Sequence, residues 1–289
     1  MKIAEPLFLW PVIAMLGIFA VPPRGEAGKE APARISVAGS TTVLPIVTRA
    51  AEKFVSDHNG EVSITVNAGG SGVGINSVGQ GRVDIGMASR EITARERKRF
   101  ESADLRVHVA GRDAVACVIS SEVYKAGIKV LSREQIRDIY LGKIRNWKEL
   151  GGPDRRIVAI DKERHRGTRH VFMQYVFNDE YARAPGALLV TGSNNEEQTK
   201  IAQSDSAIGM LSFAWINDGV VGVGIRQGKE ILQPTLENIH SGRYPISRNL
   251  NLVTRGNPKG WVKKFIDFVR GPQGQWIVES SGFVPVLQP

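Results

Sequence analysis

From residue 34 onward, the chain alternates between short apolar runs and amphipathic segments. Arg34–Gly39 has the composition of a strand, and Val43–Val55 places apolar side chains on one face of a helix. Ser40–Thr41–Thr42, between them, is predicted to cap that helix. The other predicted strands are 62–67, 83–88, 107–110, 114–120, 156–160, 207–212 and 250–254, and the other predicted helices are 73–78, 95–100, 133–140, 171–177, 194–203, 261–269 and 271–278.

This order of strand, polar turn, helix and strand is typical of a parallel α/β sheet. A length of 289 residues is compatible with about two domains. We therefore favour two α/β lobes, and one large doubly wound domain is the alternative.

The first residues have the order of a secretory signal rather than of a folded element. A short positive start at Lys2 precedes the apolar stretch Leu7–Val21, and the small residues Gly25 and Ala27 follow. The stretch contains Pro11 and is shorter than the roughly 20 residues that span a bilayer. We predict a signal peptide over residues 1–27, cleaved after Ala27, and hence export; an uncleaved anchor is the alternative.

The composition of the chain limits which ligands and metal sites can be expected. The formal net charge of +9 favours anionic partners, and export argues against nucleic acid among them. The single cysteine, Cys117, lies in an apolar run and is interpreted as a buried small hydrophobe. The basic stretch Arg95–Arg99 is interpreted as a solvated helix face. His165 and His170 are five residues apart, which is off the spacing for two ligands on one helical face, so we expect no metal site and no cofactor.

Polar turns follow several of the predicted strands. They contain Ser40–Thr41–Thr42, Ser71 within a glycine-rich segment, Ser89–Arg90, and Arg166–Gly167–Thr168–Arg169, which begins the helix that continues through 171–177. Strand C-termini and helix N-termini share one edge of a parallel α/β unit, where free backbone N–H groups favour an anion. Any one such turn could be an ordinary helix cap, but the four together predict a small oxyanion site.

Motifs for catalysis are missing. The sequence has no G-x-S-x-G elbow, no Walker loop and no H-E-x-x-H. We therefore expect a binding protein rather than an enzyme.

Five segments resemble the periplasmic phosphate-binding proteins of phosphate ABC transporters. They are ISVAGSTTVLP (35–45), NAGGSGVGI (67–75), VDIGMASRE (83–91), IYLGKIRNWKELGG (139–152) and AIGMLS (207–212). The resemblance covers about residues 34–289. It implies two α/β sandwich lobes joined by two hinge strands, in the fold of periplasmic binding proteins. Lobe I is then 34–110 plus 245–289 and lobe II is 111–244, with crossings near Val109–Asp113 and Gly242–Ser247.

The resemblance also assigns phosphate-binding residues. The hydroxyls Ser40, Thr41, Thr42 and Ser71 match, as do Ser89 and Arg90 in the branch that reads S-R at this point. In the fourth turn the family reads R-E-x-G-S-G-T-R. Gly167, Thr168 and Arg169 match it, whereas Lys162 replaces the arginine and Arg166 replaces the serine. Because arginine only donates hydrogen bonds, that last departure bears on the identity of the anion.

The sequence thus predicts a monomeric periplasmic protein that captures inorganic phosphate and delivers it to the membrane permease subunits of an ABC transporter. The alternatives are a binder or sensor of another oxyanion such as sulfate, and a secreted phosphate-ester hydrolase. Selection of phosphate over sulfate calls for a carboxylate that accepts the ligand proton. Asp113 is the candidate because it lies at the first crossing; Asp161 and Glu163 are the runners-up, and Asp84 is placed further away.

Overall fold

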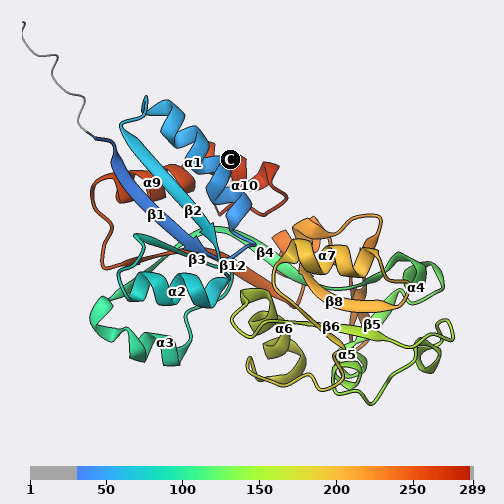
Figure 1. The fold of residues 1–289 in the computed structure, drawn as a ribbon. Coiled ribbons are helices and arrows are strands. Elements are labelled where there is room, and N and C mark those ends of the chain that lie inside the picture. The colour runs from blue at the N-terminus through green and yellow to red at the C-terminus, as the bar shows by residue number, and fades with distance from the viewer. Residues whose placement is uncertain (1–30, 287–289) are drawn as a thin grey trace, which may run out of the picture. The chain divides into compact units, whose positions relative to one another are not determined.

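A computed structural model describes residues 31–286 (Figure 1). The predicted signal peptide, residues 1–27, lies outside the described residues. Within the described part, no helix is both long enough and apolar enough to cross a bilayer. The strands are β1 (Ala33–Gly39), β2 (Val62–Ala68), β3 (Ile85–Ala88), β4 (Leu105–Ser120), β5 (Val130–Ser132), β6 (Val158–Lys162), β7 (Leu189–Thr191), β8 (Ala207–Ser212), β9 (Val220–Gly222), β10 (Gly224–Gln227), β11 (Glu230–Leu232) and β12 (Ser247–Arg255). The α-helices are α1 (Leu44–Asp57), α2 (Ser71–Gly79), α3 (Ala94–Arg99), α4 (Ser121–Lys125), α5 (Arg133–Tyr140), α6 (Gly167–Phe177), α7 (Asn194–Ala202), α8 (Leu236–His240), α9 (Gly260–Arg270) and α10 (Pro272–Ser280).

Nine strands form one mixed sheet in the order β2-β1-β3-β12-β4-β8-β6-β7, with β9 paired to β4. β1 is parallel to β2 and β3, and β6 is parallel to β7 and β8. β12 and β4 are antiparallel to each other and to their other neighbours, β3 and β8. The sheet therefore consists of two parallel groups joined through β12 and β4. A separate sheet holds β11, β10 and β5.

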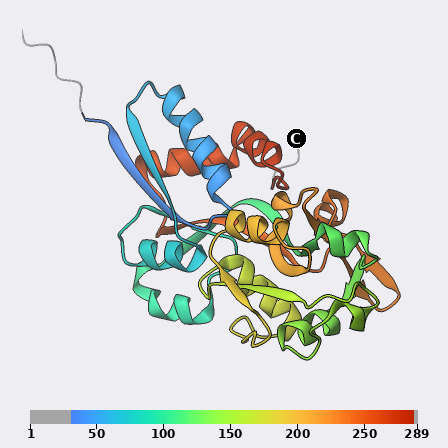
Figure 2. The same cartoon turned by 45° about the vertical axis from the view of Figure 1, so that its right-hand side comes forward.

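Helices cover both faces of the first group, β1 to β3. One face packs α1, α9 and α10 around side chains such as Val37, Phe54 and Phe265. The other face carries α2, with Ile75 and Val78 against Ala88 (Figures 1 and 2). The apolar face predicted for α1 is confirmed, since its buried residues are Ile46, Val47, Ala50, Ala51 and Phe54.

The second group, β6 to β8, is built in the same way. A large core on one face includes Tyr140 and Phe172, whose rings meet edge to face, and Trp147. The Tyr140 hydroxyl donates to the Ile160 carbonyl, and the Trp147 indole N–H donates to the Ser206 carbonyl, so both polar atoms of these buried rings are satisfied. Ile201 of α7 packs on the opposite face. The predicted fold class, two α/β lobes joined by two strands, is confirmed.

One strand prediction was wrong. The predicted strands 107–110 and 114–120 form one continuous strand, β4, although the polar pair Arg112–Asp113 interrupts the apolar pattern of the sequence. Both residues lie in the ladder with β12, and Asp113 is 2% exposed because it has a buried partner. Helix α6 begins at Gly167, which confirms that the turn Arg166–Arg169 opens the helix that continues through 171–177.

Candidate functional site

Hydroxyl side chains gather where β1, β2 and β3 end. Because the three strands are parallel neighbours, their carboxyl ends share one edge of the sheet. Ser40, Thr42, Ser71 and Ser89 lie there and are each 2% exposed or less, and Thr41 is partly exposed. Ser71 Oγ accepts from the Ser89 backbone N–H at 3.0 Å and lies 3.3 Å from Ser89 Oγ. The three turns therefore form one buried hydroxyl cluster.

The hydroxyls after β1 do not cap α1, so that prediction was wrong. The cap residue is Val43, with no side-chain cap, and Pro45 occupies the first turn. Ser40 Oγ instead accepts from the Thr42 backbone N–H at 3.2 Å, within the turn before the helix. The chain thus keeps these hydroxyls at the sheet edge, where they can meet a ligand.

The N-terminus of α6 packs directly against the hydroxyl cluster. A Cβ atom at Gly167 would lie 2.3 Å from Ser71 Oγ and 2.5 Å from Ser89 Oγ, so only glycine fits. The cap residue, Arg166, makes no side-chain cap, and the amide N–H groups of the first helical turn are therefore open to an anion. Next to it, the Gly72 N–H donates to the His165 carbonyl at 3.0 Å and joins the two lobes.

A guanidinium that the sequence reasoning missed, Arg248, lies among these hydroxyls. Its Nη1 donates to Thr168 Oγ1 at 3.0 Å, and its Nη2 donates to Thr42 Oγ1 at 3.3 Å. Nη1 also lies 3.4 Å from Ser89 Oγ. The side chain is 2% exposed. Arg248 therefore contacts hydroxyls from both lobes at once.

Asp113 holds this guanidinium in place. Its Oδ2 accepts from Arg248 Nε at 3.0 Å and from Nη2 at 2.7 Å, and the two residues face each other across β4 and β12. The other carboxylate oxygen, Oδ1, is buried and has no protein partner among the described residues. Burial raises the pKa of Asp113, and the Arg248 guanidinium opposes that shift. The predicted selectivity carboxylate therefore lies at the cluster; its Oδ1 makes no hydrogen bond of ordinary geometry within residues 31–286, although the Ser212 hydroxyl and the Ala114 N–H are close enough to oppose the rise of its pKa.

Asn194, at the start of α7, was also missed. It is 2% exposed, and its Nδ2 donates to Thr42 Oγ1 at 3.0 Å. Two signals could have found the missed residues. Arg248 is a charged residue at the entry of an apolar strand, beside the predicted crossing 242–247. Asn194 opens a predicted helix, but the short strand β7 before it was not recognised.

The four basic residues predicted for the site all pair with carboxylates. Three of these basic side chains are buried, and Arg166 is 15% exposed. Their anion-binding roles stay predictions. The partners are Glu96 for Arg90 (2.8 Å), Glu197 for Lys162, Glu163 for Arg166 (Nε to Oε2, 2.8 Å) and Asp161 for Arg169 (2.9 Å).

Lys162 and Glu197 form the most deeply buried of these pairs, with side chains 1% and 0% exposed. Burial lowers the pKa of Lys162 and raises the pKa of Glu197, and the contact between the two opposes both shifts. Lys162 also donates to the Ser193 carbonyl at 3.3 Å.

The other candidate carboxylates are engaged elsewhere. Asp161 forms an ion pair with Arg169, and Glu163 forms one with Arg166. Asp84 Oδ2 accepts hydrogen bonds from the backbone N–H and the hydroxyl of Ser36. Among residues 31–286, no three His, Cys, Asp or Glu side chains are grouped so that they could hold a metal ion.

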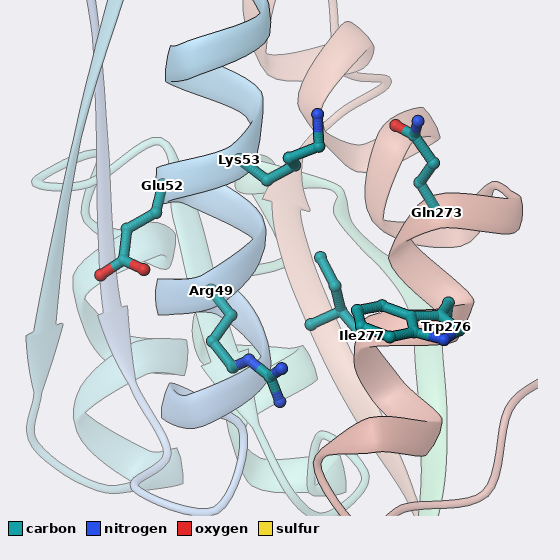
Figure 3. Close-up of a pocket in the computed structure, with 6 residues that line it drawn as sticks. All are labelled: Arg49, Glu52, Lys53, Gln273, Trp276 and Ile277. Atoms are coloured by element: carbon teal, nitrogen blue, oxygen red, sulfur yellow. The ribbon is translucent and has the colours of Figure 1, made fainter.

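A hollow of about 400 Å³ between α1 and α10 lies outside this cluster (Figure 3). Trp276, which is 64% exposed, lies on its α10 side, and Arg49 and Lys53 project from α1. None of the residues of the four turns lines it, so it is not part of the oxyanion site.

Comparisons with known proteins agree with this geometry. Residues 26–272 match the model of the PBP superfamily domain. The chain is 32% identical to the phosphate-binding protein PstS of Bacillus subtilis over 264 residues, 91% of this chain and 83% of the relative. It is 30% identical to PstS of Borreliella burgdorferi over 263 residues, 87% and 90% of the two chains.

Among solved structures, it is similar to a phosphate ABC transporter substrate-binding protein from Clostridium perfringens with bound phosphate. The identity is 32%, the TM-score is 0.79, and the match covers 88% of this chain and all of the other. A phosphate transport receptor from Vibrio cholerae matches at 28% identity and a TM-score of 0.70, over 88% of this chain and all of the other. The fold is thus that of two-lobed solute-binding proteins. The chain belongs to the PBP superfamily and, within it, to the family of periplasmic phosphate-binding proteins.

Proposed function

We propose that this protein captures inorganic phosphate in the periplasm and delivers it to the permease of an ABC transporter. The observation that carries the proposal is the meeting of Thr42, Ser89 and Thr168 with Arg248 between the lobes. Hydroxyls, helix N-termini and a guanidinium are donors that suit a tetrahedral oxyanion. The related proteins are named as phosphate-binding proteins, which supports phosphate as that anion.

The proposal also covers the signal peptide, the boundaries of the two lobes, the oligomeric state and the absence of catalysis. Residues 1–27 act as the signal peptide, 34–110 with 245–289 form lobe I, and 111–244 form lobe II. The protein works as a monomer, binds no nucleic acid and catalyses no reaction. The lobes close on the ion and replace its water with fixed donors, which requires no catalyst.

We further propose that Asp113 distinguishes phosphate from sulfate. Hydrogen phosphate carries a proton at neutral pH, and sulfate carries none. Asp113 Oδ2 is taken by Arg248, whereas Oδ1 is buried without a partner, so Oδ1 is the atom that can accept the ligand proton. The same oxygen repels a fully ionised anion, which disfavours sulfate.

Calorimetric titration with phosphate and sulfate tests both proposals. The wild type should bind phosphate and bind sulfate far more weakly, and it should not hydrolyse a chromogenic phosphate ester. In Asp113→Asn, the amide oxygen can still accept from Arg248, while the NH₂ group replaces Oδ1 and can donate to sulfate. The Asp113→Asn variant should therefore lose most of its preference for phosphate over sulfate. If it rejects sulfate as strongly as the wild type, Asp113 is not the selectivity residue; if the wild type binds no phosphate, the function itself is wrong.

A further inference from the structure

A second cavity lies next to the hydroxyl cluster and takes side chains from both lobes. This outer pocket has a volume of about 590 Å³ and is lined by Gly72, Asn76, Arg82 and Arg90 of lobe I and by Arg164 and His165 of lobe II. Gly72 and Arg90 directly follow Ser71 and Ser89 of the cluster. On each of these two turns, the residue that lines the outer pocket is therefore the immediate neighbour of a hydroxyl of the cluster.

The separation includes a contact that joins the lobes. The Gly72 N–H donates to the His165 carbonyl at 3.0 Å, and a Cβ at Gly72 would lie 3.1 Å from the His165 Cβ. Both residues line the outer pocket as well. The contact between Gly72 and His165 is therefore part of both the junction of the lobes and the wall of the outer pocket.

The charge of the outer pocket is positive. Its charged lining groups are Arg82, Arg90, Arg164 and Glu96, three positive and one negative, which leaves a net charge of +2. Arg90 is neutralised by its two hydrogen bonds to Glu96. Arg82 and Arg164 are exposed, and neither pairs with a carboxylate within the described part of the chain. The surplus charge of Arg82 and Arg164 therefore faces solvent at the outer pocket.

The helix α3, which supplies Glu96 to the outer pocket, also carries the basic stretch of the sequence. Arg95, Arg97, Lys98 and Arg99 are exposed on the helix that supplies Glu96, and α3 lies beside α2 in both views (Figures 1 and 2). The solvated helix face predicted from the sequence is thus on the same short helix as Glu96, which lines the outer pocket.

We propose that the outer pocket is a first, weak binding site for phosphate, from which the ion passes to the hydroxyl cluster as the lobes close. This inference rests on the proposed function and adds a step to it. Exposed arginines bind an anion weakly, so the step does not set the final affinity. A cleft lined by one sign of charge does raise the local concentration of the ligand and its rate of association.

Two-step binding has a measurable signature. The observed rate should rise with phosphate concentration and level off at the rate of closure, and the half-saturating concentration should report the outer pocket. Stopped-flow measurement of intrinsic tryptophan fluorescence during mixing with inorganic phosphate gives both numbers. In Arg82→Gln/Arg164→Gln, the half-saturating concentration should rise roughly three- to tenfold, with the limiting rate unchanged.

The matched control is Arg34→Gln/Arg226→Gln, which removes the same charge from two exposed positions, at the amino end of β1 and on β10. It should behave as the wild type. Arg82→Lys/Arg164→Lys keeps the charge and should keep the wild-type half-saturating concentration, which rules out a mere loss of packing.

Three results would overturn the inference. One is a half-saturating concentration in the Arg82→Gln/Arg164→Gln variant equal to that of the control. Another is an equal dependence on added NaCl in those two variants. The third is a wild type that binds no phosphate at equilibrium, which overturns the proposed function as well; the first two overturn only the outer pocket.

Discussion

The hydroxyl cluster of lobe I and the charged turn of lobe II use polar groups in opposite ways. In lobe I, Ser40, Thr42, Ser71 and Ser89 are neutral, and no carboxylate among residues 31–286 forms a hydrogen bond with them. In lobe II, the turn from Asp161 to Arg169 is dense in charge, and its buried or partly buried cations each have a carboxylate partner.

The difference shows that many buried charges need not mean charge available to a ligand. A buried cation must be paired, because leaving it alone costs several kcal/mol. Lys162 and Arg169 are paired by carboxylates that do not touch the hydroxyl cluster. Arg248 is also paired, with Asp113, but its remaining N–H groups point to hydroxyls of both lobes. The positive charge at the hydroxyl cluster therefore comes from Arg248 on β12, one of the two strands that join the lobes, and not from the turn Asp161–Arg169.

The largest expected effect is a loss of stability when the Lys162–Glu197 ion pair is broken. Lys162→Met leaves the Glu197 carboxylate buried without its partner, and we expect the free energy of unfolding to fall by about 3–5 kcal/mol. Urea denaturation measures it. Lys162→Met/Glu197→Gln should recover most of the loss, and Lys53→Met, at an exposed pair, should change little. Unchanged stability in the single variant, with weaker phosphate binding, would assign Lys162 to the ligand instead.

The pH dependence of stability tests the surroundings of His170 on α6. Burial, with Arg90 nearby, lowers the pKa of His170 from 6.5 to about 4. The folded state therefore binds fewer protons than the unfolded state between these values. The stability that depends on a neutral His170 is complete above pH 6.5 and is lost as the pH falls, by about 3 kcal/mol near pH 4.

Urea denaturation from pH 7 to pH 4 should show this slope in the wild type and a shallower one in His170→Gln. His240→Asn, a change at an exposed histidine, is the control. Parallel curves for the wild type and His170→Gln would show that His170 is not the group responsible.

Removing the guanidinium at the cluster should weaken binding. Arg248→Gln loses charge-assisted hydrogen bonds to the anion, each of which contributes about 1.5–3 kcal/mol. Calorimetry should therefore show phosphate affinity roughly ten- to a hundredfold lower. Arg248→Gln/Asp113→Asn removes both charges, so no acid is left unpaired, and because it also removes the acceptor for the ligand proton it should show at least the same loss in a folded protein. Wild-type affinity in this double variant would remove Arg248 from the site.

Arg90 should have the smallest effect on affinity, because its guanidinium donates to both oxygens of Glu96 at 2.8 Å. We expect Arg90→Gln to weaken phosphate binding less than tenfold, and therefore less than Arg248→Gln does. Glu96→Gln, which releases Arg90 from its partner, should leave the affinity unchanged. A loss in Arg90→Gln as large as that in Arg248→Gln would mean that Arg90 reaches the anion directly.

The sequence by itself determined the alternation of strands and helices and the positions of the polar turns. These features follow from local rules: the apolar period of α1, the glycines around Ser71, and hydroxyls directly after a strand. It also predicted that Asp113 lies where the chain passes between lobes. The parallel order of β1 to β3 then places Ser40, Ser71 and Ser89 on one edge.

Only the tertiary structure decided which charged groups meet the hydroxyls. Arg248 and Asp113 are 135 residues apart and become partners through the register of β12 on β4. The carboxylates that pair with Arg90 and Lys162, Glu96 and Glu197, lie 6 and 35 residues further along the chain, on α3 and α7. A local pattern shows that a cation follows a strand, but its partner depends on how distant elements pack, because a buried charge is stabilised only by contacts in the folded protein.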